Sequence, residues 1–147
     1  RILSSAASDV YKRQGWGVWT MEYRPDFNAV ESGMDVFINW KKDFVGKEAT
    51  LKALNEGVSQ KLVTMVIDTN GIDVAHDEAI LKDGVPVGYV SSGGYAHHVG
   101  KSMAMGYVAA EFAAAGTTLQ VEILGNFYDA EVLAGPIYDG NGVNMRS

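Results

Sequence analysis

Hydrophobic and polar residues alternate with a period of two through most of the chain after Ser59. Such alternation predicts β-strands with one buried face. The alternating stretches, each bounded by Gly, Asn or Asp, are KLVTMVID, EAILKDGVPVGYVSS, KSMAMGYVA, TTLQVEIL and FYDAEVLA. Five or six short strands in close succession predict an antiparallel barrel or sandwich over residues 59–135. Asp83-Gly84 and Gly125-Asn126 separate alternating runs and predict two-residue hairpin turns.

A helical pattern precedes the strands. The stretch DFVGKEATLKALNEG is rich in straight-chain helix formers, and its apolar stripe consists of Val45, Leu51, Leu54 and Val58. This pattern predicts one clear helix at about residues 45–56, with Gly57 directly after its last turn.

Residues 15–40 contain two extended runs. Trp16, Val18 and Thr20 alternate with their neighbours, Pro25 interrupts the pattern, and VFINW at residues 36–40 is a short apolar run. We therefore predict strand, loop and strand. The segment is dense in aromatic residues, namely Trp16, Trp19, Tyr23, Phe27, Phe37 and Trp40. These rings would either pack against the predicted barrel or stack on a flat heterocycle.

The two ends of the chain follow neither pattern. Residues 1–14 (RILSSAASDVYKRQ) lack sustained periodicity and an initiating Met, so we interpret them as a foreign or artefactual tail. Residue 15 then begins within a strand-like run, which favours a truncated domain. After Gly135-Pro136 the alternation stops, and residues 136–147 are interpreted as a polar tail.

Composition narrows the possible functions. The 147 residues are 47% hydrophobic and 20% charged, carry a formal net charge of −6 and include no Cys. The missing thiols exclude cysteine nucleophiles, thiolate zinc sites and iron–sulfur ligation. The acidic balance argues against a nucleic-acid partner, and no apolar stretch approaches the roughly 20 residues that span a membrane. We expect a soluble intracellular protein.

The string GGYAHHVGKS resembles a phosphate-binding loop at its end, Gly100-Lys101-Ser102. Five residues separate Gly94 from Gly100 where that motif has four, and a strand pattern follows instead of a helix. We predict a connection between two strands, with Gly93 or Gly94 at a positive φ angle.

His76, His97 and His98 are the three histidines, and Asp77 adjoins the first. Neighbouring histidines in an extended chain point to opposite faces, so we predict local hydrogen bonds and no metal site. A Ser-His-Asp triad is disfavoured because no G-x-S-x-G motif is present.

Lysines concentrate in the middle of the acidic chain, at Lys41, Lys42, Lys47, Lys52 and Lys61. They fit two interpretations, a solvated helix face or a site for a polyanion such as a polyglutamate tail.

Three stretches together resemble the C-terminal part of the dimethylglycine and sarcosine dehydrogenase family: GWGVWTMEYRPDFNAVESGMDVFINWKKDFVGKEA, VSSGGYAHHVGKSMAMGYV and AEVLAGPIYDGNGVNMR. The same patterns are similar to the aminomethyltransferase, or T-protein, of the glycine cleavage system. The resemblance spans residues 15–146. It implies a mostly β, α+β fold, in which residues 15–58 are a remnant of a folate-binding domain and residues 59–135 form a six-stranded antiparallel barrel.

The resemblance also implies a function for the parent protein. An FAD-dependent half would oxidise dimethylglycine or sarcosine, and tetrahydrofolate in the second half would accept the one-carbon unit. This chain contains no G-x-G-x-x-G, so we expect it to lack the FAD domain and to be inactive alone. The alternatives are a fragment of a stand-alone aminomethyltransferase and a non-catalytic barrel that serves as a binding module. The expected location is the bacterial cytoplasm, or the mitochondrial matrix in a eukaryote, and the oligomeric state is open.

Site residues are carried over only where the motifs match. Lys41 or Lys42 occupies the place of a basic residue that helps to hold folate, and Glu31 matches the acidic residue of a P-x-E-x-G-like turn whose Pro is replaced here. The family's pterin-binding Glu would fall at Arg13. The resemblance therefore assigns no catalytic residue to this chain. It also implies that only the helix and the barrel wall can cover the apolar surface of Trp16, Trp19, Phe37 and Trp40, since the strands of the folate domain are missing.

Overall fold

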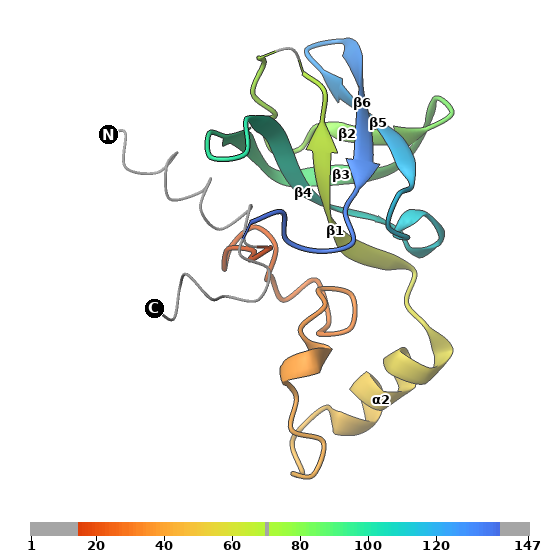
Figure 1. Ribbon diagram of the computed structural model, residues 1–147. Coiled ribbons are helices and arrows are strands. Elements are labelled where there is room, and N and C mark those ends of the chain that lie inside the picture. The colour runs from red at the N-terminus through yellow and green to blue at the C-terminus, as the bar shows by residue number, and fades with distance from the viewer. Residues whose placement is uncertain (1–14, 70, 139–147) are drawn as a thin grey trace.

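A computed structural model describes residues 15–69 and 71–138 of the chain (Figure 1). Within these ranges there are one α-helix, two 3₁₀ helices and six strands. The elements in chain order are η1 (Asp35–Phe37), α2 (Lys47–Glu56), β1 (Gln60–Ile67), β2 (Ala79–Lys82), β3 (Val85–Ala96), β4 (Lys101–Ala109), η2 (Ala110–Phe112), β5 (Thr118–Ile123) and β6 (Asn126–Val132).

The six strands form a closed barrel in the order β1-β4-β3-β2-β5-β6. Every neighbouring pair is antiparallel, and β1 closes the barrel by pairing with β4 on one side and with β6 on the other. The predicted mostly β fold with a six-stranded barrel is confirmed. Closure gives each of the six strands a hydrogen-bonded neighbour on both sides over part of its length.

The barrel interior is filled mainly by the hydrophobic side chains that alternate with polar ones along the strands and therefore share one face of the sheet. The buried cluster consists of Val63, Met65, Ile67, Val74, Ile80, Val90, Ala104, Val108, Leu119, Val121, Ile123, Ala130 and Val132. On β4 the intervening residues Met103, Met105 and Tyr107 point to the outer face, yet they are only 0–2% exposed. The outer face of β4 is therefore covered as well.

Residues 15–40 contain no strand, so the predicted strand-loop-strand arrangement is wrong. Local hydrogen bonds take its place: the N–H groups of residues 20–23 all donate to the Val18 carbonyl, at 3.0–3.2 Å. Further along, the Asn28 side chain accepts the N–H groups of Val30 and Glu31 at 2.9 and 3.0 Å, which is an Asx turn. The predicted second strand is a 3₁₀ turn, η1.

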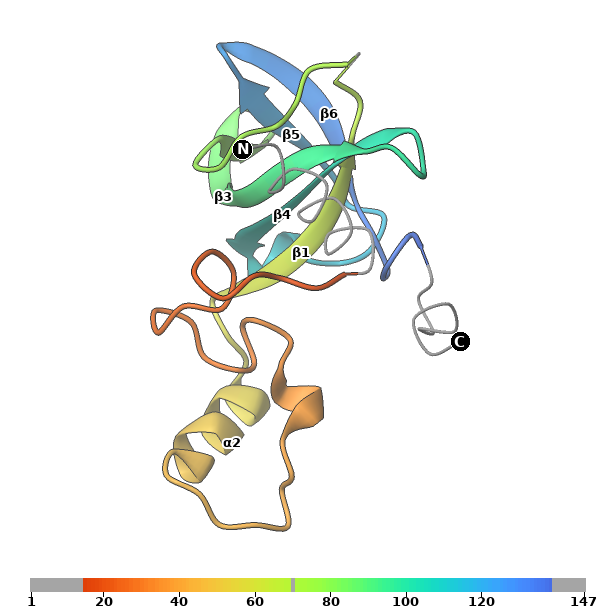
Figure 2. The ribbon, with the colours of Figure 1, turned by 90° about the vertical axis from the view of Figure 1, so that its left-hand side faces the viewer.

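The opening segment nevertheless has partners on the barrel. The Phe27 ring stacks on Tyr107 of β4 with 3.7 Å between ring centroids, and the Leu62 N–H of β1 donates to the Glu31 carbonyl at 2.8 Å. In Figure 2 the segment crosses the lower end of the barrel beside β1. The segment is therefore attached to the barrel at Phe27 and Glu31, while Trp16, Trp19 and Phe37 are 37–79% exposed.

The predicted helix is confirmed as α2, and Gly57 follows it with a φ of 86°. Its apolar stripe does not reach the barrel. Val45 precedes the helix and is fully exposed, Leu54 is 44% exposed, and no helix residue is buried. Both ribbon views place α2 away from the barrel, next to the orange loop that leads into it (Figures 1 and 2).

One hairpin turn matches the prediction and the other is displaced. Asp83 and Gly84 have φ angles of 51° and 78°, as a type I′ turn requires. In the second hairpin the positive φ angles belong to Leu124 (51°) and Gly125 (78°), and Asn126 begins β6. The prediction of Gly125-Asn126 was therefore wrong by one residue. No helix in the described ranges is long and apolar enough to cross a membrane.

Candidate functional site

The GGYAHHVGKS segment forms the connection between β3 and β4. β3 ends at Ala96, whose carbonyl accepts the N–H groups of Val99 and Gly100, and β4 begins at Lys101. A strand follows the glycine, so the segment does not form a phosphate-binding loop. The positive φ angle belongs to Gly100 (65°), so its prediction at Gly93 or Gly94 was wrong. Gly93 is needed for close approach, because a Cβ there would lie 2.4 Å from the Val74 carbonyl oxygen.

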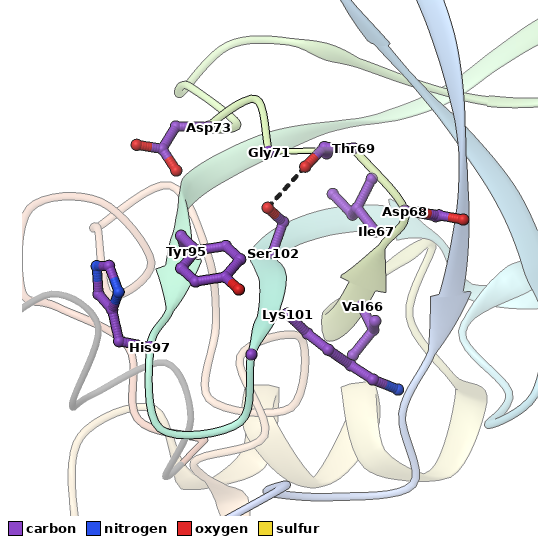
Figure 3. Close-up of a pocket in the computed structure, with 11 residues that line it drawn as sticks. Val66, Ile67, Asp68, Thr69, Gly71, Asp73, Tyr95, His97, Lys101 and Ser102 are labelled. Carbon is purple, nitrogen blue, oxygen red and sulfur yellow. Dashed lines mark hydrogen bonds between the residues drawn. The ribbon is translucent and has the colours of Figure 1, made fainter.

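A cavity of about 830 Å³ lies beside this connection (Figure 3). Its lining includes the buried residues Thr69 and Ser102, whose hydroxyls are 2.7 Å apart and hydrogen-bonded to each other. Its rim carries side chains of both signs, with Asp68 and Asp73 on one hand and Lys101 on the other. These groups include both donors and acceptors of hydrogen bonds. Among the described lining residues, the Ser102 hydroxyl bonds to Thr69 and to the Ile72 carbonyl, and no hydrogen bond joins it to His97, Asp68 or Asp73.

Each of the three histidines contacts one other side chain. His76 Nδ1 lies 2.7 Å from Asp77 Oδ2, His97 stands edge-on to Tyr95, and His98 stands edge-on to Tyr138. Within residues 15–69 and 71–138, no three His, Asp or Glu side chains are grouped closely enough to hold a metal ion.

Glu31 is fixed against the start of the barrel. Its Oε2 accepts the Asn28 N–H at 2.8 Å, and its Oε1 accepts a hydrogen bond from Gln60 Nε2 at 3.3 Å. With the bond from Leu62 to its carbonyl, Glu31 is held at both its side chain and its backbone.

Lys41 and Lys42 lie in the exposed turn between η1 and α2. The Lys41 N–H donates to Asn39 Oδ1 at 3.1 Å, and no hydrogen bond in the described ranges joins either lysine to Glu31. The structure therefore does not bring the three predicted folate-side residues into contact. The other lysines of the region fit a solvated helix face, since Lys47 pairs with Asp43 and Lys52 pairs with Glu56.

A second, mainly apolar cavity of about 460 Å³ opens within the opening segment. Its lining consists of Trp19, Thr20, Tyr23, Arg24, Pro25, Phe27, Ala29, Ser32 and Met34. Trp19 is 79% exposed, whereas Phe27 packs on Tyr107. Phe27 therefore shows the predicted packing against the barrel and also lines the cavity together with Trp19 and Tyr23. Stacking on a heterocycle stays a prediction.

Glu22 is the charged side chain that sequence reasoning missed. It is 0% exposed, its Oε2 accepts the Val18 N–H at 2.7 Å, and its Oε1 accepts the Ser91 hydroxyl at 2.6 Å. The Glu22 carbonyl in turn accepts the Tyr107 hydroxyl at 2.8 Å. Burial raises the pKa of Tyr107 far above its usual value, and the nearby Tyr89, Glu31 and Glu22 add to this increase.

Comparison with known proteins identifies the class of protein to which the closed antiparallel barrel and its attached opening segment belong. Residues 60–139 match the model of the glycine cleavage T-protein C-terminal barrel domain. The chain belongs to this family. A solved structure, the glycine cleavage system aminomethyltransferase T from Bartonella henselae, has the same fold, with a TM-score of 0.84 over 92% of this chain and 38% of that chain at 22% identity.

Two kinds of relative share about a third of their residues with this chain. Mitochondrial dimethylglycine dehydrogenase from Mus musculus is 33% identical over 121 residues, which are 81% of this chain and 14% of that protein. Aminomethyltransferase from Desulfitobacterium hafniense (strain DSM 10664 / DCB-2) is 33% identical over 122 residues, which are 82% of this chain and 33% of that protein. The chain thus spans a third or less of each, and both alignments extend beyond the barrel into the opening segment or helix.

Proposed function

We propose that this chain is the C-terminal part of a folate-dependent enzyme that removes N-methyl groups oxidatively from dimethylglycine or sarcosine, with tetrahydrofolate as the one-carbon acceptor. The observation that carries the proposal is the similarity to dimethylglycine dehydrogenase over 121 residues, a length that includes the cavity-forming opening segment or the helix in addition to the barrel. An FAD-binding half, which would oxidise the amine, belongs to the parent protein. The mouse relative is named mitochondrial, and the location that we propose for this protein is the mitochondrial matrix in a eukaryote and the cytoplasm in a bacterium.

The 460 Å³ cavity supports the folate part of the proposal. Its apolar lining and the rings of Trp19 and Tyr23 suit a flat heterocycle or its aminobenzoyl ring. Ala29 and Ser32 line this cavity, and Glu31, which lies between them in the chain, holds their turn through its hydrogen bonds to Asn28 and Gln60. Lys41 and Lys42 would attract the glutamate carboxylates from the exposed turn.

The residues of this chain would act by binding and orientation. Tetrahydrofolate supplies its own nucleophilic nitrogens when bound, so the protein has to position them and to exclude water. A cavity with apolar walls and a fixed turn performs that task without a catalytic dyad. The stand-alone aminomethyltransferase is the second candidate, because a relative of that name is equally similar over the same length.

Folate binding by the chain tests the proposal directly. We expect 5-formyltetrahydrofolate, a stable reduced folate, to bind with a dissociation constant above about 0.1 mM. Binding should be weak because the chain lacks some of the polar groups that hold folate in the family, and each buried hydrogen bond lost weakens binding by about 1–3 kcal/mol. The double variant Lys41→Ala/Lys42→Ala should weaken it further. Lys82→Ala, at a lysine on β2 outside this group of lysines, is the matched control and should have no effect. Calorimetry that finds no binding at millimolar concentration, or equal binding by both variants, would contradict the folate assignment.

A further inference from the structure

The opening segment is fixed to the barrel at one buried carboxylate. Glu22 is 0% exposed, and no lysine, arginine or histidine of residues 15–69 and 71–138 forms an ion pair with it. A buried carboxylate without a counter-charge is costly unless its oxygens are hydrogen-bonded. Both oxygens are, one to the Val18 N–H and one to the Ser91 hydroxyl. Hydrogen bonds of this kind hold Glu22 in a single arrangement.

The barrel is shaped to receive this carboxylate. In the β3–β4 pairing, Val90 faces Gly106 and Ser92 faces Met105, so Ser91 is an extra residue in a β-bulge. A bulge turns a side chain away from the direction that regular alternation would give it. Here it brings the Ser91 hydroxyl within 2.6 Å of Glu22 Oε1 and 3.0 Å of the Met105 carbonyl.

A second attachment lies next to the first. The Tyr107 hydroxyl, from the neighbouring strand β4, donates to the Glu22 carbonyl at 2.8 Å, and the same Tyr107 ring stacks on Phe27. Glu22 is thus held by two strands at its side chain and its backbone. The residues that follow it directly, Tyr23 and Arg24, line the 460 Å³ cavity.

We propose that Glu22 is a positioning residue, which together with Ser91 and Tyr107 fixes the cavity-forming segment on the barrel wall. The barrel then supports ligand binding without contacting the ligand through these three groups. This inference concerns the site of the proposed function and rests on that function only for the identity of the ligand.

The geometry distinguishes the substitutions at this position. Glutamine can keep every contact: its Oε1 accepts the Val18 N–H, its amide nitrogen donates to the Ser91 oxygen, and the Ser91 hydroxyl then donates to the Met105 carbonyl. Alanine leaves the Val18 N–H without its acceptor and opens a space between the segment and β3. Glu22→Gln should therefore preserve the attachment that Glu22→Ala removes.

Amide hydrogen exchange of the 147-residue chain tests the attachment without any ligand. For Glu22→Ala we expect exchange in residues 17–34 to accelerate on the order of 10-fold or more, because a buried donor loses its partner. The strands β1–β6 should change by less than about 2-fold, since the core does not include Glu22. Glu22→Gln should stay close to the unmodified chain. Glu111→Ala, at an exposed glutamate in η2, is the matched control.

Each contrary result has a definite meaning. Unchanged exchange in residues 17–34 would overturn the proposal, and so would equal acceleration throughout the barrel, which would show that Glu22 supports the whole fold. A Glu22→Gln variant as fast as Glu22→Ala would show that the hydrogen-bond pattern is not what holds the segment. Binding of 5-formyltetrahydrofolate, measured on the same variants, should weaken in Glu22→Ala and recover in Glu22→Gln. If the unmodified chain binds no folate, the proposed function fails while the exchange result still decides the role of Glu22.

Discussion

At the scale of single residues, Gly17 is a position of the opening segment with no room for a side chain. A Cβ at Gly17 would lie 2.6 Å from the Glu22 Cβ and 3.0 Å from both the Glu22 Cγ and the Tyr23 Cζ. Because the Glu22 Cβ is next to the backbone, it cannot move aside as the end of a side chain would. We expect Gly17→Ala to lower the free energy of unfolding by about 1–3 kcal/mol in urea denaturation, as overpacking typically does. Gly135→Ala is the control, since nothing lies within 4 Å of its Cβ. Equal stability of the two variants would mean that the turn around Val18 relaxes freely.

The burial of Glu22 could not be predicted from the sequence. Its neighbours in the chain, Met21 and Tyr23, give no sign of a buried carboxylate. The group that stabilises it, Ser91, is 69 positions away and reaches it only because of a bulge in β3. Asp83-Gly84 was predictable because a type I′ turn depends on those two residues alone. The roles of Glu31, Lys41 and Lys42 came from family resemblance, and they stay predictions.

At the scale of elements, the turn of the β5–β6 hairpin places Leu124 in a left-handed conformation, which leucine disfavours. Leu124 has a φ of 51° and is 86% exposed, so it gains little burial in return. Asn adopts this left-handed conformation more easily, and Asn-Gly is a preferred type I′ pair. We expect Leu124→Asn to raise the free energy of unfolding by about 0.5–1 kcal/mol. Phe127→Asn, at an exposed apolar residue with ordinary backbone angles, should not stabilise the chain. A lower midpoint of thermal unfolding for Leu124→Asn would contradict this account.

The same hairpin shows why the alternating pattern predicted the strands better than the turn between them. Ile123 pairs with Asn126 because this register turns Val121 and Ile123 of β5 and Ala130 of β6 into the core, and the turn must fit between them. Local turn preference pointed to Gly125-Asn126, but the core decided the register. Residues 16–20 alternate as the barrel strands do, yet they have no neighbouring strand. The N–H groups of Gly17 and Val18 donate instead to the Tyr23 and Glu22 side chains, and that of Thr20 donates to the Val18 carbonyl. Alternation alone could not reveal this arrangement.

At the scale of the whole molecule, the barrel and the opening segment form one packed unit. The period of two predicted the barrel, since its strands pair with one another and bury a single face. Attachment of the opening segment depends on the outer face of β4, where Tyr107 is 1% exposed and contacts both Phe27 and Glu22. Alternation places Tyr107 on that outer face but does not tell what covers it. The aromatic density of residues 15–40 was the one available signal, and it fitted two roles.

This attachment should make the stability of the molecule sensitive to alkaline pH. Burial raises the pKa of Tyr107, and burial likewise raises that of Tyr89, whereas tyrosines of the unfolded chain ionise near about 10. Above that pH the unfolded chain releases protons that the folded chain keeps, so the free energy of unfolding falls as pH rises, by up to about 1.4 kcal/mol per pH unit for each such proton. We expect Tyr107→Phe to lose about 1 kcal/mol at pH 7 with its hydrogen bond to Glu22, but to show a shallower decline between about pH 10 and 12. Urea denaturation at several pH values measures both slopes. If the unfolding free energies of the unmodified chain and of Tyr107→Phe fall with the same slope, Tyr107 ionises as readily in the folded chain as in the unfolded one. That result would contradict its burial beneath Phe27 and Glu22.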